Sequence, residues 1–144
     1  MTYRFEDSPG RLTQELSKAY GNALLSNIKK KGYDIGIPEW STLSFLSSKH
    51  QASQQEIALF LGVGKVFVKR LIDKMERRNL VRRSIRQADR RYNVVQLTSA
   101  GTDLFEKVKP LAEETISKAS RNISVEEYHQ FMRIIEKMKE NLAL

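Results

Sequence analysis

Residues 53–97 contain the pattern that most constrains the fold: two short amphipathic helices separated by a glycine turn, followed by two short strands. Ser53 and Glu56 have capping-box spacing, so a helix is expected to start at Ser53. Residues 62–64, Gly-Val-Gly, interrupt this helix. A second helix is expected next, because apolar residues then recur at helical spacing. They are Val68, Leu71, Ile72 and Met75. Two helices joined by a Gly-containing turn are typical of a helix-turn-helix.

A β-hairpin is expected directly after this unit. Asn79 is expected to end the second helix, because asparagine tolerates the left-handed conformation found at helix ends. Leu80–Ile85 and Asn93–Leu97 have the composition of strands, and a polar tip lies between them. A hairpin in this position is the wing of a winged helix-turn-helix.

Further helices are expected on both sides of the unit. Apolar residues at four-residue spacing predict a helix over Arg11–Lys30, and Pro38 has the fixed φ favoured at a first helical position. Thr98 is expected to cap a following helix, and Ser124 with Glu127 forms a second capping box that opens the last one. The expected fold class is therefore mainly α, of the α+β type, with a two-stranded wing.

The terminal helices carry more apolar surface than a small three-helix core can bury, and the remaining surface requires a partner. We therefore expect a single domain over residues 1–144 that forms a homodimer. In this scheme residues 1–36 and 99–144 are dimerisation helices, and residues 37–98 form the winged helix-turn-helix lobe.

The positive charge of the chain is concentrated in the same lobe. The net charge is +8, and residues 62–92 hold eleven basic and three acidic residues, which accounts for all of it. A single charged run is usually a solvated helix face. A basic segment on an otherwise neutral chain instead suits a polyanionic partner, a nucleic acid or an anionic membrane surface. We expect double-stranded DNA to be that partner.

The sequence offers little for catalysis, metal binding or a membrane span. It has no cysteine, which excludes disulfides and thiol chemistry. His50 and His129 are far apart, and neither has a second ligand at metal-binding spacing. No apolar run approaches the roughly 20 residues that cross a bilayer, and the polar residues 1–10 do not read as a signal peptide. We expect a cytoplasmic protein that is not an enzyme and needs no cofactor.

The wing segment resembles that of the multiple-antibiotic-resistance-regulator (MarR) family. Asp89 and Arg91, followed by Leu97-Thr98 and Gly101, fit the family's wing pattern of Asp, any residue, Arg, a gap, Leu-Thr and a nearby Gly. Residues of the preceding helix and strand, including Leu71 and Asp73, also match. The resemblance implies a homodimeric transcriptional regulator, usually a repressor, bound to a pseudo-palindromic operator.

Five residues of the second helix of the helix-turn-helix are candidates for DNA contact. Such a helix inserts its N-terminal part into the major groove. Lys69 and Arg70 can reach phosphate or the acceptor edge of guanine, and Val66 and Phe67 can touch a thymine methyl group. Lys65 completes the set at the start of the helix. Ordinary core packing is the alternative for Val66 and Phe67.

The wing tip supplies the second group of candidates: Arg86, Arg90 and Arg91. An arginine at the end of a hairpin suits the narrow, electronegative minor groove of A·T-rich DNA, and the resemblance gives Arg91 that position. Asp89 is expected to have a structural role in the wing, because phosphates would repel a carboxylate that faced them. A solvated loop is the alternative for these arginines.

The resemblance also implies an effector site between the lobe and the dimerisation helices, for a small amphipathic or aromatic molecule. Tyr20 and Trp40 are the candidates to line it, although aromatic residues at helical spacing are more often core. The alternative function is an architectural or low-specificity nucleic-acid-binding protein without an effector, which a measured specificity ratio would separate from a regulator.

Overall fold

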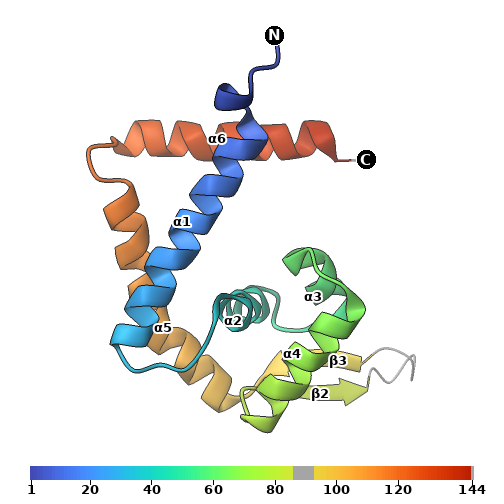
Figure 1. Cartoon of the computed structure of the whole chain (residues 1–144). Coiled ribbons are helices and arrows are strands. Elements are labelled where there is room, and N and C mark those ends of the chain that lie inside the picture. The colour runs from blue at the N-terminus through green and yellow to red at the C-terminus, as the bar shows by residue number, and fades with distance from the viewer. Residues whose placement is uncertain (86–92, 144) are drawn as a thin grey trace.

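The computed structural model describes residues 1–85 and 93–143 and shows a mainly helical chain with one small sheet (Figure 1). The elements are a 3-10 helix (Phe5–Asp7), α1 (Pro9–Lys30), α2 (Ile37–Lys49), β1 (Ala52–Ser53), α3 (Gln54–Leu61), α4 (Lys65–Arg77), β2 (Val81–Ile85), β3 (Asn93–Leu97), α5 (Ser99–Ala119) and α6 (Val125–Leu142). In Figure 1, α2–α4 and the sheet form a lobe at one end of the molecule, α6 lies at the other end, and α1 and α5 run between the two.

The predicted helix-turn-helix is formed by α3 and α4. Its capping box is present: the Ser53 backbone N–H donates to a Glu56 carboxylate oxygen at 2.7 Å, and the Glu56 backbone N–H donates to Ser53 Oγ at 3.1 Å. Gly62 then ends α3 with φ 67°, a left-handed conformation that glycine adopts without steric cost. Asn79 follows α4 with φ 56°, as its sequence position predicts.

The sheet has three antiparallel strands in the order β1-β3-β2, one more than the sequence predicts. The register pairs Val81 with Leu97 in the hairpin and Ala52 with Val95 at the other edge of β3. The additional strand, β1, has only two residues, and the second of them, Ser53, is also the N-cap of α3. A strand of this length shows no alternation in the sequence. Its pairing ties the start of the helix-turn-helix to the hairpin.

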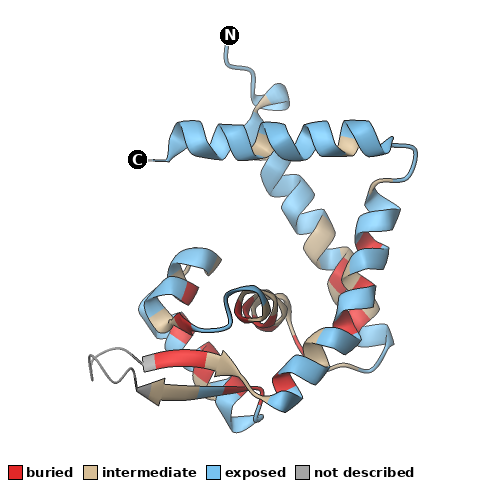
Figure 2. Ribbon diagram, turned by 180° about the vertical axis from the view of Figure 1, so that it is seen from behind, coloured by how far each residue is buried: buried red, intermediate tan, exposed pale blue. Residues whose placement is uncertain are grey.

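One apolar core fills the lobe and extends into the adjoining halves of α1 and α5 (Figure 2). The apolar stripe predicted for the first helix divides along its length. Leu24 and Ile28 are buried in this core, whereas Leu12 and Leu16 are exposed. The largest side chains with less than 2% exposure are Ile28, Leu43, Leu46, Ile57, Ile72, Met75, Val68, Val81, Val95, Val108 and Thr42.

The helix α6 contains no buried residue, although its sequence has an apolar stripe (Figure 2). Phe131, Ile134 and Met138 are between 43% and 48% exposed. Its capping box is formed as predicted, with Glu127 accepting from the Ser124 backbone N–H at 2.8 Å. Within the described ranges, no helix is both long enough and apolar enough to span a bilayer.

The first turn of α5 lies directly against the end of the loop that leads into β2. Thr98 caps α5 by accepting from the Gly101 backbone N–H at 3.0 Å, and its hydroxyl donates to the Asn79 carbonyl oxygen. A Cβ atom added to Gly101 would lie 2.0 Å from the Leu80 carbonyl oxygen. Only glycine permits this approach, which explains why a glycine follows the Leu-Thr pair.

We predict that Gly101→Ala destabilises the chain by roughly 1–3 kcal/mol or more, because the added methyl group forces α5 away from the Leu80 backbone. Urea unfolding measures this change. Gly10→Ala is the matched control: its added Cβ would meet only Ser8 Oγ at 3.9 Å, so that variant should be neutral or slightly more stable. Equal midpoints for Gly101→Ala and the wild type would contradict the packing described here.

Candidate nucleic-acid interface

The helix α4 has one buried face and one exposed basic face. Val68, Leu71, Ile72 and Met75 are all at most 7% exposed and pack into the core. All five candidate DNA-contact residues of α4 are exposed. Val66 is 66% exposed and Phe67 47%, so neither is a core residue of this chain. The exposed set is Lys65, Val66, Phe67, Lys69 and Arg70.

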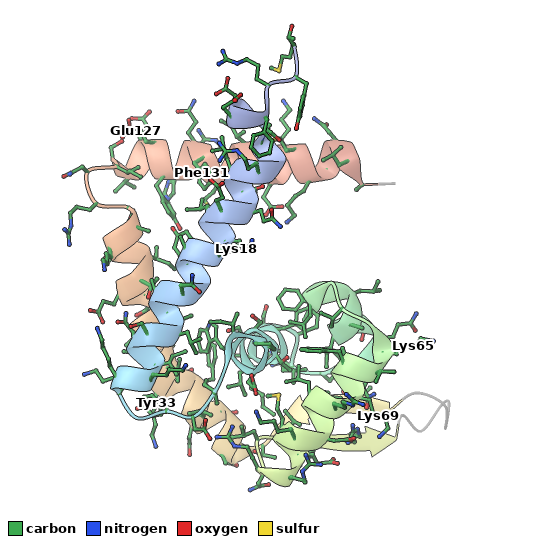
Figure 3. All side chains as sticks on the ribbon, in the orientation of Figure 1. Lys18, Tyr33, Lys65, Lys69, Glu127 and Phe131 are labelled. Carbon is green, nitrogen blue, oxygen red and sulfur yellow. The ribbon has the colours of Figure 1, made fainter. Side chains whose placement is uncertain are left out.

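The start of α4 is an open helix N-terminus. Gly64 is its N-cap and provides no side chain to satisfy the first backbone N–H groups. These groups and the helix dipole favour an anion, and Lys65 adds a positive charge beside them. Figure 3 shows Lys65 and Lys69 on the side of α4 that points away from α2. This end of the helix therefore suits a phosphate group electrostatically.

The tip of the hairpin lies outside the described residues. The residues predicted there, Arg86, Asp89, Arg90 and Arg91, fall within 86–92. The described strands β2 and β3 bring the base of the hairpin beside α4. Arg82 on β2 is exposed and donates to Gln96 Oε1 on β3 at 3.2 Å.

Arg83 on β2 forms a cluster that the sequence does not reveal. Its guanidinium donates to Gln54 of α3 at 2.7 Å, and to Asp73 and Glu76 of α4 at 2.7 and 2.9 Å. Its backbone N–H donates to the other oxygen of Glu76 at 3.1 Å. Within a run of basic residues nothing marks Arg83 as the partly buried one, with its side chain 19% exposed.

Asp73 is shared by two cations. Lys69 Nζ donates to one carboxylate oxygen at 3.0 Å and Arg83 Nη2 donates to the other at 2.7 Å. These hydrogen bonds, first from Lys69 and then from Arg83, hold the pKa of Asp73 below its usual value. The carboxylate is therefore ionised at neutral pH and neutralises part of the basic face of α4.

A second carboxylate joins α4 to α2. Glu39 is 6% exposed, and it accepts from Lys74 Nζ at 2.8 Å and from the Gly36 backbone N–H at 3.1 Å. Burial alone would raise the pKa of Glu39, but the hydrogen bonds from Lys74 and the backbone outweigh it, so the pKa lies below its usual value. The buried carboxylate is thus charged and paired at neutral pH.

Tyr20 and Trp40 line one cavity of about 280 Å³ where α1, α2 and α5 meet. The sequence predicts both as ligand candidates, and the structure brings them together. Trp40 also stacks on Phe105 of α5 with ring centroids 5.4 Å apart. A neighbouring cavity of about 250 Å³ shares Tyr20 and Thr115 and reaches Lys118. The remaining residues of the first cavity are Ser17, Gly21, Leu24, Ile37, Ala112, Thr115 and Ile116.

The two histidines lie apart on the surface. His50 follows α2 and His129 is in α6, and both are exposed. In residues 1–85 and 93–143, no three His, Cys, Asp or Glu side chains are grouped to hold a metal ion.

Comparison with known proteins shows a likeness to one family. Residues 33–91, which include α2–α4 and β2, match the family model of the MarR family. A MarR-family transcriptional regulator from Silicibacter pomeroyi superposes with a TM-score of 0.83 at 22% identity, covering 96% of this chain and 92% of that one.

Two further structures have the same fold. One is BpsR from Bordetella bronchiseptica, studied for the regulation of its DNA binding by 6-hydroxynicotinic acid; it has a TM-score of 0.80 at 21% identity, covering 96% of this chain and 98% of that one. The other is a cysteine-to-serine mutant of MarR from E. coli complexed with operator DNA, with a TM-score of 0.77 at 19% identity, covering 90% of this chain and 91% of that one.

We predict that the Glu39–Lys74 pair makes stability depend on pH in the acid range. Because the folded pKa of Glu39 is depressed, its contribution is fully present above the ordinary value of 4.5 and is lost as the pH falls through the folded pKa. The wild type should therefore exceed Glu39→Gln in stability at neutral pH, and the difference should shrink below 4.5. Urea unfolding of both proteins across this range tests it; a difference that stays constant with pH would refute the charged pair.

Proposed function

We propose that this chain is a winged helix-turn-helix regulator of the MarR family and binds double-stranded DNA sequence-specifically as a homodimer. In this proposal it acts in the cytoplasm, occupies a pseudo-palindromic operator and represses transcription by occlusion. Proteins of this family are regulators rather than enzymes. The observation that carries the proposal is α4, whose apolar face is buried while its basic face remains open to a partner.

The exposed residues of α4 suit the major groove. Arg70 can donate two hydrogen bonds to guanine, and Lys69 can reach a phosphate or a base edge. Val66 and Phe67 provide apolar contacts for a thymine methyl group. In the proposed complex the wing arginines, above all Arg91, enter the adjacent minor groove.

The proposed dimer rests on apolar surface that the chain itself leaves uncovered. Phe131 on α6 (Figure 3) is exposed, and so are Leu12 and Leu16 on the N-terminal half of α1. Apolar side chains gathered on long terminal helices mark an interface with a second protein surface. A second copy of this chain supplies such a surface. The resulting dimer has two-fold symmetry, which matches the symmetry of a palindromic operator. The two α4 helices would then enter successive major grooves about 34 Å apart.

We also propose that a small aromatic or amphipathic acid binds the cavity of Tyr20 and Trp40 and weakens DNA binding. The cavity is mostly apolar, which suits an aromatic ring. Lys118 lines the neighbouring cavity and offers a cation for a carboxylate. Because α2 contributes Trp40 to the cavity and Glu39 to the pair with α4, a ligand there would act close to the DNA-binding helix.

For DNA binding, we predict that Arg70→Ala costs about 1–3 kcal/mol and relaxes base preference at one position in each half-site. Arg91→Ala should weaken binding strongly while leaving major-groove preferences intact. Affinity measurements on a site selected from random DNA test both variants. Arg4→Ala removes an arginine far from the lobe and serves as the control. The proposed mode of binding fails if Arg70→Ala and Arg91→Ala both bind that site as tightly as the wild type.

For assembly, we predict that the full chain sediments as a dimer at micromolar concentration, and that Phe131→Asp shifts it to monomer or aggregate. A charge at this position would be buried unpaired in the interface. Arg133→Asp, on the polar side of the same helix, is the control and should remain dimeric. A wild-type protein that sediments as a monomer contradicts the proposed interface.

For the effector, we predict that an aromatic acid found by screening changes the fluorescence of Trp40, the one tryptophan of the chain, and weakens operator binding. Ala112→Phe should block both effects, because Ala112 lines the cavity and the larger side chain fills it. If no compound in a broad screen alters either signal, the chain has no effector of this class and is regulated through its abundance.

A further inference from the structure

Arg83 occupies a position where β2, α3 and α4 meet. Its side chain is 19% exposed and contacts Gln54, Asp73 and Glu76 through three different nitrogen atoms. A planar guanidinium with five fixed N–H donors suits such a convergence of acceptors, and a lysine ammonium does not reproduce it. Arg83 is therefore held by the lobe and is not free to reach a partner.

Lys69 lies on the open face of α4, and its side chain is 69% exposed. Its ammonium is paired with Asp73 Oδ2 at 3.0 Å, while Arg83 holds Oδ1 of the same carboxylate. An ammonium that stays beside Asp73 meets a phosphate together with the negative charge of the carboxylate, so Lys69 neutralises a phosphate fully only when it leaves Asp73. That exchange is easy only if another cation continues to neutralise the carboxylate.

We propose that Arg83 is a positioning residue for DNA binding, which retains Asp73 and thereby releases Lys69 to a phosphate. The inference rests on the proposed function, since it requires that α4 binds DNA. With Arg83 present, Asp73 keeps a short charge-assisted hydrogen bond when Lys69 leaves. Without Arg83, Lys69 is the remaining cation on Asp73, and a bare carboxylate on this face repels the backbone of the DNA.

The electrostatic arrangement of the cluster supports this role. Asp73 and Glu76 are the acidic residues of α4, and Arg83 contacts both of them. One largely shielded arginine thus compensates the negative charge that α4 carries within its basic surface. The hydrogen bonds from Lys69 and Arg83 also keep the pKa of Asp73 depressed, so the carboxylate remains charged at neutral pH and competition for Lys69 persists.

The test is a double-mutant cycle on the salt dependence of DNA binding. Each phosphate contact contributes about 0.9 to the slope of log affinity against log salt. Lys69→Met should lower the slope by about this amount. Arg83→Met should lower it equally, because Lys69 then stays on Asp73. The double variant Lys69→Met/Arg83→Met should show no further loss of slope, although its unpaired Asp73 carboxylate lowers the affinity itself.

A rescue experiment, in which the Asp73 carboxylate is removed, distinguishes the positioning role of Arg83 from a purely structural role. Asp73→Asn in the Arg83→Met background should return the slope and most of the affinity, since Lys69 is free again. If Arg83 only tied the elements together, deleting a further member of the cluster would not rescue binding. Arg82→Met, at the neighbouring position of β2, is the matched control. Any loss of slope that it causes should add to the loss caused by Lys69→Met.

Each outcome decides the proposal. The proposal is overturned if the losses of slope for Lys69→Met and Arg83→Met are additive. It is also overturned if Asp73→Asn does not restore the slope of Arg83→Met, or if Lys69→Met has the slope of the wild type. If Arg83→Met does not fold, Asp73→Asn alone remains decisive, because it should retain the full slope and affinity; a loss as large as that of Lys69→Met contradicts the proposal. A wild-type protein without any preferred DNA site would instead refute the proposed function itself.

Discussion

Four apolar side chains on one face of α4 position the other elements of the lobe. Val68, Leu71, Ile72 and Met75 pack into the core that α2, α3 and the sheet share. Because helical geometry places these residues on one side, the basic residues between them must face outward. The same constraint that stabilises the lobe therefore orients its candidate DNA-binding surface.

Polar contacts then fix how the neighbouring elements meet α4. Glu39 ties it to α2 through Lys74, and Arg83 ties it to β2 and α3. The Gly101 backbone lies against Leu80, which sets α5 beside the base of the hairpin. These contacts connect the cavity side of the lobe, the hairpin and α4 into one packed unit.

Local sequence signals predicted most of the helices and the hairpin correctly. Ser53 with Glu56, Ser124 with Glu127, and Thr98 mark helix starts through hydrogen bonds that span only three residues. Contacts between distant residues were harder to predict. The strand β1 is two residues long, and Arg83 meets acceptors as far away as Gln54, so neither leaves a periodic pattern. The sequence also shows the apolar stripe of α6, but only the structure shows that this chain leaves it exposed.

In the proposed function, the exposed face of α4 reads a DNA sequence as well as binding phosphates. Charge alone would produce tight binding to any DNA at low salt, as an architectural protein shows. The most direct test is the ratio of affinities for a site selected from random DNA and for a scrambled duplex, at physiological salt. Sequence-specific regulation predicts a ratio of about 10³ or more. A ratio near one, with equal salt dependence for both duplexes, would contradict it and indicate the architectural function.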